Sequence, residues 1–290
     1  MSTSGIRRVI LLTLGFEELP KSFSVHGDTS GDRLREPVPA ILLEADGGWV
    51  LLDTGLNPAL IRDEAMNRRF HGRNHNIEAI LTGPGEPLEE ALDDAGVPIS
   101  EIAIVAVSHL HNDHAGGLRH FADLDVPVHL QQREYDYGFS EHPGPEQHGM
   151  FRVDYDDPAI TWHLSDGDVD IAPGLRAVRS PGHTPGHQSF VVDLDPTVGG
   201  GGYVFAFDAA DLSENIEHER AIGGFINCTP EETVDSIRRL KAIAGEKGYP
   251  LIPGHDPVVW PALKQEFAQR WPQPAFDGTE MTLKVAKAAG

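Results

Sequence analysis

One six-residue segment, His109 to His114, constrains this chain more than any other. It holds three histidines and an aspartate, and it follows the apolar run Ile102–Val107 almost directly. Such a run, bounded by turn residues, predicts a buried strand. Side chains at the end of a buried strand are held rigidly at the edge of a sheet, where catalytic sites tend to form. Because imidazole nitrogen and carboxylate oxygen suit a borderline divalent metal, the segment predicts a metal site rather than a histidine-rich polar turn.

Three later segments follow the same plan, in which a short strand leads to a metal-type ligand. These pairs of strand and ligand are Leu175–Arg179 with His183, Tyr203–Phe207 with Asp208, and Leu251–Ile252 with His255. Taken singly, each is more often a plain turn than a ligand-bearing loop. Four strand ends that each deliver a ligand are hard to explain by packing, so the sequence predicts that folding gathers them into one site.

The order of these residues resembles the metallo-β-lactamase superfamily and, more narrowly, its N-acyl homoserine lactonases. The resemblance runs from about Val38 to Pro261 and includes Leu51–Gly55 and the doubled Pro-Gly-His turn. It implies an α/β fold, the αββα sandwich, with a dinuclear metal site at the edge between two mixed sheets. Residue by residue, it implies one metal at His109, His111 and His183, a second at Asp113, His114 and His255, and Asp208 as the bridge between them. The two ions would be divalent, zinc in the first place, with manganese, cobalt or iron as alternatives.

The resemblance also implies a reaction, the opening of a lactone ring by a hydroxide shared between the two metals. A dinuclear site can generate hydroxide near neutral pH, polarise the carbonyl and stabilise the departing alkoxide. No protein nucleophile is needed, and the sequence has no Gly-x-Ser-x-Gly segment to offer one. Asp113 is expected to help manage the proton.

The position three residues after Asp208 departs from the family pattern. Many N-acyl homoserine lactonases have a tyrosine there that donates a hydrogen bond to the substrate carbonyl, whereas this chain has Asp211. An ionised carboxylate would repel a developing oxyanion. Asp211, a candidate catalytic residue, is therefore protonated, points away, or serves another substrate group such as an amide N–H. A further alternative is that Asp211, and not Asp208, is the bridge.

Other residues are assigned supporting roles. Asp53 follows the apolar run Trp49–Leu52, and in the family this aspartate lies behind the metal ligands, where carboxylates orient histidines. The alternative for Asp53 is a plain turn without a metal role. His187 is assigned either the same position behind the ligands or a structural hydrogen bond. An apolar wall for an acyl chain is predicted, largely in the long segments 61–85 and 135–155, from Met66, Phe70, Tyr137, Phe151 and Phe225. Ordinary packing is the alternative for each.

Composition limits the classes of partner. The formal net charge of −22 over 290 residues would repel nucleic acid and anionic membrane, and it favours a neutral small molecule. No stretch approaches the roughly 20 apolar residues of a membrane span, and the run Val9–Leu14 is too short for a signal peptide. The single cysteine, Cys228, rules out an internal disulfide and suits a reducing cytosol. We therefore predict a cytoplasmic enzyme with a small lactone substrate; a homodimer is left open.

One metallo-β-lactamase-like domain over residues 1–290 is predicted, with a weakly determined tail from about residue 276. Helices are expected at Pro87–Ala95, ended by Gly96, and after the capping box at Thr229. The second helix should bury one face, formed by Val234, Ile237 and Leu240. Besides the segments already named, strands are predicted at Val9–Leu14, Ala40–Glu44, Trp49–Leu52, Val126–Leu130, Ser189–Leu194 and near Trp162, with a hairpin tip at glycines 199–202.

The predicted function is a dinuclear metal-dependent hydrolase that opens lactones, above all N-acyl homoserine lactones. The nearest alternative is a thioester hydrolase of the glyoxalase II type, which has the same ligands but adds a C-terminal helical portion; only 35 residues follow His255 here. Another small-lactone hydrolase is a further alternative. A di-iron gas-binding module would need an electron-transfer domain, and an inactive scaffold would not keep the complete ligand set.

Overall fold

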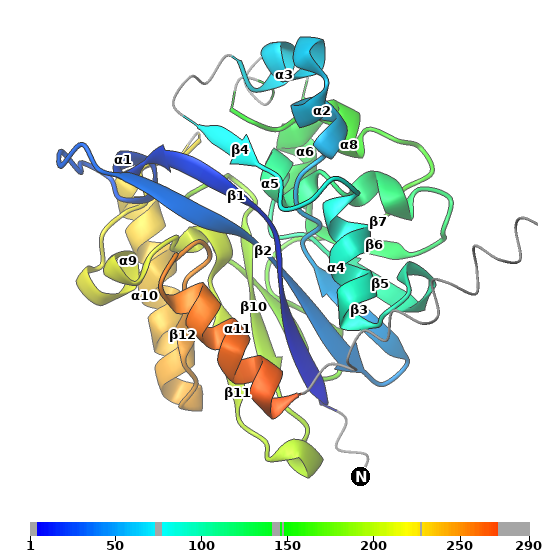
Figure 1. Ribbon diagram of the computed structural model, residues 1–290. Helices are drawn as coiled ribbons and strands as arrows, with labels where there is room; N and C mark the ends of the chain where they lie inside the picture. The colour runs from blue at the N-terminus through cyan, green and yellow to red at the C-terminus, as the bar shows by residue number, and fades with distance from the viewer. Residues whose placement is uncertain (1–4, 73–76, 141–145, 147, 227, 272–290) are drawn as a thin grey trace, which may run out of the picture.

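Two mixed β-sheets pack face to face in the computed structural model, which describes residues 5–72, 77–140, 146, 148–226 and 228–271 (Figure 1). Among these residues the larger sheet has the order β4-β1-β2-β3-β5-β6-β7, formed by β1 Arg8–Pro20, β2 Arg33–Ala45, β3 Gly48–Leu52, β4 Glu78–Ile80, β5 Ile102–Ala106, β6 Pro127–Gln131 and β7 Thr161–Ser165. The smaller sheet has the order β12-β11-β10-β9-β8, formed by β8 Val169–Ala172, β9 Leu175–Arg179, β10 Gln188–Asp193, β11 Gly202–Phe205 and β12 Leu251–Ile252.

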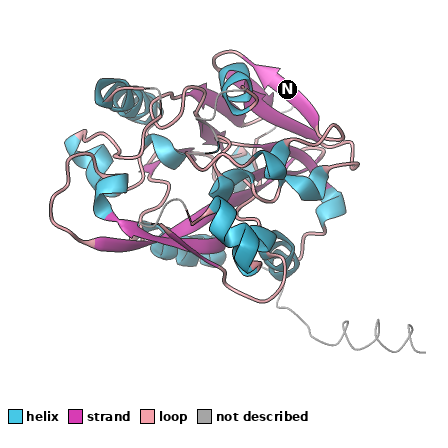
Figure 2. Cartoon of the chain, turned by 90° about the horizontal axis from the view of Figure 1, so that it is seen from above, coloured by secondary structure: helices cyan, strands magenta, loops and turns pink. Residues whose placement is uncertain are grey.

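Helices and short 3₁₀ turns connect these strands (Figure 2). The α-helices of the described residues are α1 Lys21–Ser24, α2 Pro58–Arg62, α3 Glu64–Phe70, α4 Pro87–Ala95, α5 Asn112–Ala115, α6 Gln132–Gly138, α8 Arg152–Tyr155, α9 Ser213–His218, α10 Pro230–Lys247 and α11 Val259–Arg270. The 3₁₀ turns are η1 Ile99–Glu101, η2 Leu118–Phe121, η3 Pro196–Val198 and η4 Phe207–Ala209.

Alternating side chains along β1 divide the core into layers. Val9 and Leu11 belong to a buried cluster between the sheets that includes Phe190 of β10, whereas Ile10 and Leu12 belong to the cluster on the other face, which α4 covers. Helix α10 covers the outer face of the smaller sheet in the same way. Successive strand residues point to opposite faces, so each sheet buries both of its faces. The predicted αββα sandwich is confirmed.

Strand direction explains why distant segments of the chain meet. Strands β3, β5 and β6 run parallel, so the turns after β3 and β5 leave the larger sheet at one edge. In the smaller sheet, β9 and β11 each pair antiparallel with β10, and β12 pairs parallel with β11. Strands β9, β11 and β12 therefore share one direction, and the turns that follow them leave from one edge. These are the turns in which the predicted ligands lie.

Some predicted boundaries and faces were wrong. Strands β1 and β2 extend well beyond Val9–Leu14 and Ala40–Glu44 although their outer parts are partly polar. The reason is that these outer parts pair with each other, and that of β1 also pairs with β4. Val234 is only half-buried, whereas Thr233 and Ser236 of α10 are buried. The reason is that α10 packs on the turn before His183, where the Ser236 hydroxyl donates to the Pro181 carbonyl.

Other predicted elements were confirmed. Helix α4 has the predicted bounds and ends at Gly96 in the left-handed conformation, and Thr229 forms the predicted capping box of α10 with Glu232. Glycines 199–201 lie in the connection between the antiparallel strands β10 and β11, as predicted for a hairpin tip, whereas Gly202 begins β11. The predicted tail from residue 276 lies outside the described residues, and the single-domain organisation stays a prediction. None of the described helices is long and apolar enough to cross a membrane.

A buried acid between α2 and α8 gives a pH-dependent prediction. Asp154 accepts a hydrogen bond from the Asn57 amide (2.7 Å), and burial raises its pKa to about 7. Because the folded-state pKa lies above the unfolded one, Asp154 favours folding at low pH and loses that contribution as pH rises towards 7. We expect the stability difference between the wild type and Asp154→Asn to fall by about 3 kcal/mol between pH 5 and pH 8. Urea unfolding at several pH values measures the free energy of unfolding of each protein. The control is Asp156→Asn, which changes an exposed carboxyl and should show the same pH dependence of stability as the wild type. If the stability of all three proteins changed with pH in parallel, the prediction would be contradicted.

Candidate metal centre

The loop after β5 is fixed at both ends by contacts with the segment after β3. The Ser108 backbone N–H and hydroxyl donate to the two carboxylate oxygens of Asp53, at 2.6 and 2.7 Å. His111 then serves as the N-cap residue of α5. At Gly116, just after this helix, a Cβ would lie 2.3 Å from the backbone nitrogen of Asn57, so only glycine is accommodated. Close packing between this loop and the segment after β3 thus fixes both ends of the His109–His114 segment.

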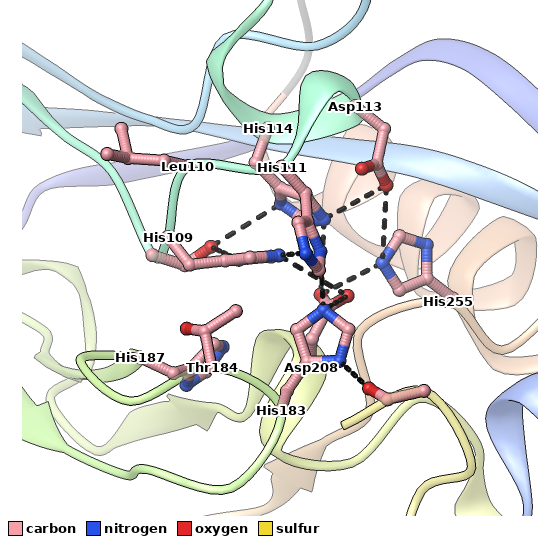
Figure 3. A network of polar contacts seen from close by, with 12 residues as sticks. His109, Leu110, His111, Asp113, His114, His183, Thr184, His187, Asp208 and His255 are labelled. Carbon is pink, nitrogen blue, oxygen red and sulfur yellow. Dashed lines mark hydrogen bonds and ion pairs between the residues drawn. The ribbon is translucent and has the colours of Figure 1, made fainter. Parts of the chain in front are cut away.

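The first predicted ligand group converges on one side of Asp208 (Figure 3). The Nδ1 atom of His111 lies 3.0 Å from Nε2 of His109 and 2.7 Å from Nε2 of His183. Carboxylate oxygen Oδ2 of Asp208 lies 3.8 Å from Nε2 of His109 and 3.4 Å from Nε2 of His183. These three imidazoles present their ligand atoms to a common point.

The second group converges on the other carboxylate oxygen of Asp208. Oδ1 of Asp208 lies 3.2 Å from Nε2 of His114 and 2.9 Å from Nε2 of His255. Oδ2 of Asp113 lies 3.1 Å from Nε2 of His114 and 3.9 Å from Nε2 of His255. The structure therefore brings all seven predicted ligands together, and it places Asp208 between the two groups with one oxygen toward each (Figure 3).

Hydrogen bonds behind four of the histidines fix which ring nitrogen faces the site. Ser108 donates its hydroxyl proton to Asp53, so it can only accept from Nδ1 of His109. A ring that donates through Nδ1 leaves Nε2 free as a ligand atom. The four Nδ1 contacts are His109 to Ser108 Oγ (3.0 Å), His114 to Asp53 Oδ2 (2.6 Å), His183 to the Gly224 carbonyl, and His255 to the Pro37 carbonyl (2.9 Å).

The electrostatics of the cluster suit metal ligation. Burial, followed by the charge of His114, holds the pKa of His109 well below its ordinary value, which keeps this ring neutral. Burial opposes ionisation of Asp113, but the charge and hydrogen bond of His114 and the charge of His255 together outweigh it and lower the pKa of the carboxyl to about 2. Against the effect of burial, the neighbouring carboxylates raise the pKa of His114 and of His255 well above the ordinary value. Imidazole nitrogens and carboxylate oxygens that converge in this way form the donor set that divalent metals take, so the residues present fit two such ions.

Glu134, which sequence reasoning missed, joins the two main ligand loops. From α6 its carboxylate accepts bonds from the Leu110 N–H (3.1 Å), the Thr184 hydroxyl (2.7 Å) and the Gly186 N–H (3.0 Å). Leu110 lies between His109 and His111, and Thr184 follows His183. No local sequence pattern indicated a role for Glu134, because its hydrogen-bond partners are more than 20 residues away along the chain. Glu134 is thus the carboxylate that holds one loop against the other.

His187 and Asp53 lie directly behind the ligands. His187 is buried, bonds through Nδ1 to the Ser180 hydroxyl (2.9 Å), and has its ring 5.3 Å from that of His109. Burial lowers the pKa of His187 to about 3, so the ring is neutral. Asp53, at a positive φ of 59°, contacts both His114 and Ser108. Asp53 contacts the ligand His114 directly, as a backing residue would, whereas His187 makes the structural hydrogen bond given as its alternative. Both roles stay predictions.

A cavity of about 350 Å³ opens onto the two ligand groups, and one part of its wall is apolar. Of the residues predicted to hold an acyl chain, Phe70, Phe151 and Phe225 line this cavity, and Ile77 lines it too. Met66 and Tyr137 do not line it, because Met66 packs behind the first two phenylalanines and Tyr137 packs against the core under α6.

Another part of the wall is acidic. Asp211 lines the cavity, so it does not point away from it, and its buried Oδ1 has no hydrogen-bond partner. Glu17 of β1 and Glu36 of β2, both missed from the sequence, line the cavity as well. Burial raises the pKa of Glu36 to about 7; burial, then the charge of Asp208, raises the pKa of Asp211 well above its ordinary value. Unlike Asp208, Asp211 belongs to none of the groups whose ligand atoms converge among the described residues.

Comparison with known proteins agrees with this geometry. The family model of the metallo-β-lactamase superfamily matches residues 33–255. The N-acyl homoserine lactonase AttM of Azorhizobium caulinodans is 32% identical over 238 residues, which cover 79% of this chain and 85% of the relative. The chain belongs to the metallo-β-lactamase superfamily and, within it, to the N-acyl homoserine lactonases.

Solved structures of this lactonase family have the same fold. One is a variant of AiiA from Bacillus thuringiensis with N-decanoyl-L-homoserine at its active site, and another is an N-acyl homoserine lactone hydrolase with its product N-hexanoyl-L-homoserine at the catalytic metal centre. Each is 27% identical with a TM-score of 0.75, covering 87% of this chain and 94% of the other. The family resemblance and the fold class predicted from the sequence are confirmed.

Proposed function

We propose that this lactonase-family protein hydrolyses lactones at a dinuclear metal centre, with N-acyl homoserine lactones as the substrate class that its relatives support best. The observation that carries the proposal is the position of Asp208, whose two oxygens each face one group of ligands. An imidazole-rich donor set of this kind accepts zinc, which we propose as the metal, and also manganese, cobalt or iron. The single cysteine supports a reducing compartment, and we place the enzyme in the cytoplasm.

The ligand groups and the cavity wall would contribute different parts of the ring-opening reaction. Bound divalent ions would supply Lewis-acid polarisation and an acidified water. Water adds to the carbonyl carbon, the ring C–O bond breaks, and the departing alkoxide takes a proton. Asp113 lines the cavity beside His114, so we propose that its carboxylate relays that proton. The apolar side, with Phe70 and Phe151, would take an acyl chain.

Asp211 stands where many enzymes of the family have a tyrosine. Burial, then the charge of Asp208, raises its pKa well above the ordinary value, so the carboxyl is held in its protonated form. We propose that its O–H donates a hydrogen bond to the substrate carbonyl, as the tyrosine would.

Metal removal provides the test. Dialysis against a strong chelator should reduce lactone hydrolysis at least a hundredfold, because the buried imidazoles and carboxylates alone cannot acidify a water. Adding back two equivalents of zinc, manganese or cobalt should restore it. The measurement is proton release from N-hexanoyl-homoserine lactone with a pH indicator, alongside elemental analysis. Full activity in metal-free protein would contradict the proposal, and cleavage of S-lactoylglutathione with inert lactones would favour thioester hydrolysis instead.

A further inference from the structure

Two glutamates on neighbouring strands face the cavity together. Strands β2, β1 and β4 lie next to one another in the larger sheet (Figure 1). Glu36 of β2 is the direct register partner of Glu17 of β1, and Glu17 in turn pairs with Ala79 of β4. Directly opposite residues of an antiparallel pair project to the same face, and both glutamates line the cavity. We call Glu17 and Glu36 the glutamate pair.

The glutamate pair lies between the metal ligands and the apolar side of the cavity. At one end, the backbone carbonyl of the residue after Glu36 accepts a bond from Nδ1 of His255 at 2.9 Å. At the other end, Ile77 lines the cavity two residues before Ala79, the β4 partner of Glu17. The wall therefore runs from His255 through the two glutamates to Ile77. An N-acyl lactone has the same order, with its amide between the ring and the acyl chain.

The pair offers one acceptor and one donor. The Ser24 hydroxyl donates to Oε1 of Glu36 at 2.5 Å, so that carboxyl already acts as an acceptor. The Glu17 carboxyl has no hydrogen bond or ion pair with the described residues, and no lysine or arginine among them lines the cavity. Two facing carboxylates without a cation would repel each other.

The acidities of the two carboxyls agree with this division. Burial raises the pKa of Glu36 to about 7, whereas burial, then the charge of Asp113, raises the pKa of Glu17 well above its ordinary value. Above pH 7, therefore, Glu36 is ionised and accepts, while Glu17 keeps a proton that it can donate.

A secondary amide matches such a pair. Its N–H is a donor and its C=O an acceptor, and the two point to opposite edges of the planar group. An ester of the same shape keeps the carbonyl but loses the N–H, and an alkyl chain has neither. A site built to hydrogen-bond its substrate rejects an analogue that leaves its buried polar groups unpaired. The metal centre acts on the ring ester, which all these lactones share, so it cannot make this distinction.

We propose that the glutamate pair recognises the amide of the substrate, with the Glu36 carboxylate accepting a hydrogen bond from the amide N–H and the Glu17 O–H donating one to the amide carbonyl. The inference rests on the proposed lactone hydrolysis and names the residues that select N-acylated lactones. The ring carbonyl then lies beside Asp211, and the acyl chain extends along Ile77 towards Phe151. Neither glutamate takes part in bond making.

The test compares lactones that share the ring and the chain length but differ in the linkage between them. With metal-loaded enzyme at pH 8, kcat/KM is measured for N-hexanoyl-homoserine lactone, for its ester analogue α-hexanoyloxy-γ-butyrolactone and for α-heptyl-γ-butyrolactone. The wild type should prefer the amide over the ester about tenfold and over the alkyl lactone about a hundredfold. Spontaneous hydrolysis of each lactone is measured without enzyme and subtracted.

Variants test the donor and the acceptor separately. Glu17→Leu should reduce the preference for the amide over the alkyl lactone about tenfold, whereas Glu17→Gln should retain it, because its N–H₂ group replaces the carboxyl O–H as donor. Glu36→Leu should abolish the preference for the amide over the ester, the comparison that reports on the N–H. The matched control is Glu18→Leu, because Glu18 neighbours Glu17 on β1 but pairs with Arg33 at the surface; it should keep the wild-type ratios.

A binding measurement separates this inference from the proposed function. The probe is the cyclopentanone analogue of N-hexanoyl-homoserine lactone, in which a CH₂ group replaces the ring oxygen, so that no ester bond can be opened. Calorimetric titration should show equal binding to the wild type, Glu17→Gln and Glu18→Leu, and about tenfold weaker binding to Glu17→Leu and Glu36→Leu. Circular dichroism confirms that each variant is folded.

The outcomes are distinct. Equal kcat/KM for the three lactones, with unchanged ratios in Glu17→Leu and Glu36→Leu, would overturn the inference and leave lactone hydrolysis intact. If no lactone is opened, the proposed function fails, and the titration alone decides: weaker binding to both leucine variants supports recognition of the amide, and unchanged binding overturns it.

Discussion

Asp208→Asn should lower kcat/KM for N-hexanoyl-homoserine lactone about a thousandfold and reduce the bound metal from two equivalents to one or fewer. An amide offers one acceptor oxygen, so the variant would turn an N–H₂ group toward either His183 or His255, each of which now faces a carboxylate oxygen. A thousandfold loss corresponds to about 4 kcal/mol of transition-state stabilisation. Steady-state kinetics and elemental analysis of the same preparation measure both effects.

A matched control separates this local effect from the loss of one surface charge. Asp170 is an exposed carboxylate of β8, in the outer strand of the smaller sheet. Asp170→Asn should retain wild-type kinetics and metal content. If Asp208→Asn kept two metal equivalents and near-normal turnover, Asp208 would not be the bridge, and the alternative assignment of that role to Asp211 would have to be reconsidered.

Glu134→Gln should destabilise the protein by about 4 kcal/mol and reduce kcat at least tenfold. The native carboxyl accepts bonds from Thr184 and Gly186 through one oxygen and from Leu110 through the other. An amide must turn its N–H₂ group toward one of these donors, which leaves two buried donors without an acceptor at a cost of about 1–3 kcal/mol each. Because these bonds hold the two ligand loops together, their loss should also displace His109 and His183.

Urea unfolding measures the stability change. Metal affinity is the second measurement, because a loss of stability far from the ligand loops would leave it unchanged. The control is Asp136→Asn, which changes an exposed carboxylate of the same helix, α6. It should match the wild type in both measurements. A Glu134→Gln variant with normal stability and normal zinc affinity would show that the loops hold their positions without this carboxylate.

Local sequence patterns predicted the ligands because each lies close to a recognisable strand end. The motif from His109 to His114 and the Pro-Gly-His turn at His183 are short-range signals, and so are the strand ends before Asp208 and His255. Helix α4 was predicted with its bounds for a similar reason, since proline at its start and Gly96 at its end act on the adjacent backbone.

Residues that act through partners distant in sequence could not be predicted from such local patterns. Glu134 looks like any acidic helix residue until folding brings Thr184 beside it, 50 positions along the chain. Glu17 and Glu36 lie in outer strand segments whose polar character gave no sign of a strand, and only their pairing turns both toward the cavity. Tyr137 illustrates the reverse error, because an aromatic residue in a long segment is as ready to join the core as to line a pocket.

The sequence alone determined the chemistry of this protein, since the types and order of the ligands specify a metal centre and the alternation of apolar residues specifies two buried sheets. Tertiary structure alone decided which oxygen of Asp208 faces which histidines, and that Glu17 and Glu36 line the cavity. The physical reason is range: strand alternation and turn chemistry act over a few residues, whereas a site depends on the relative placement of segments joined only by the packing of the two sheets.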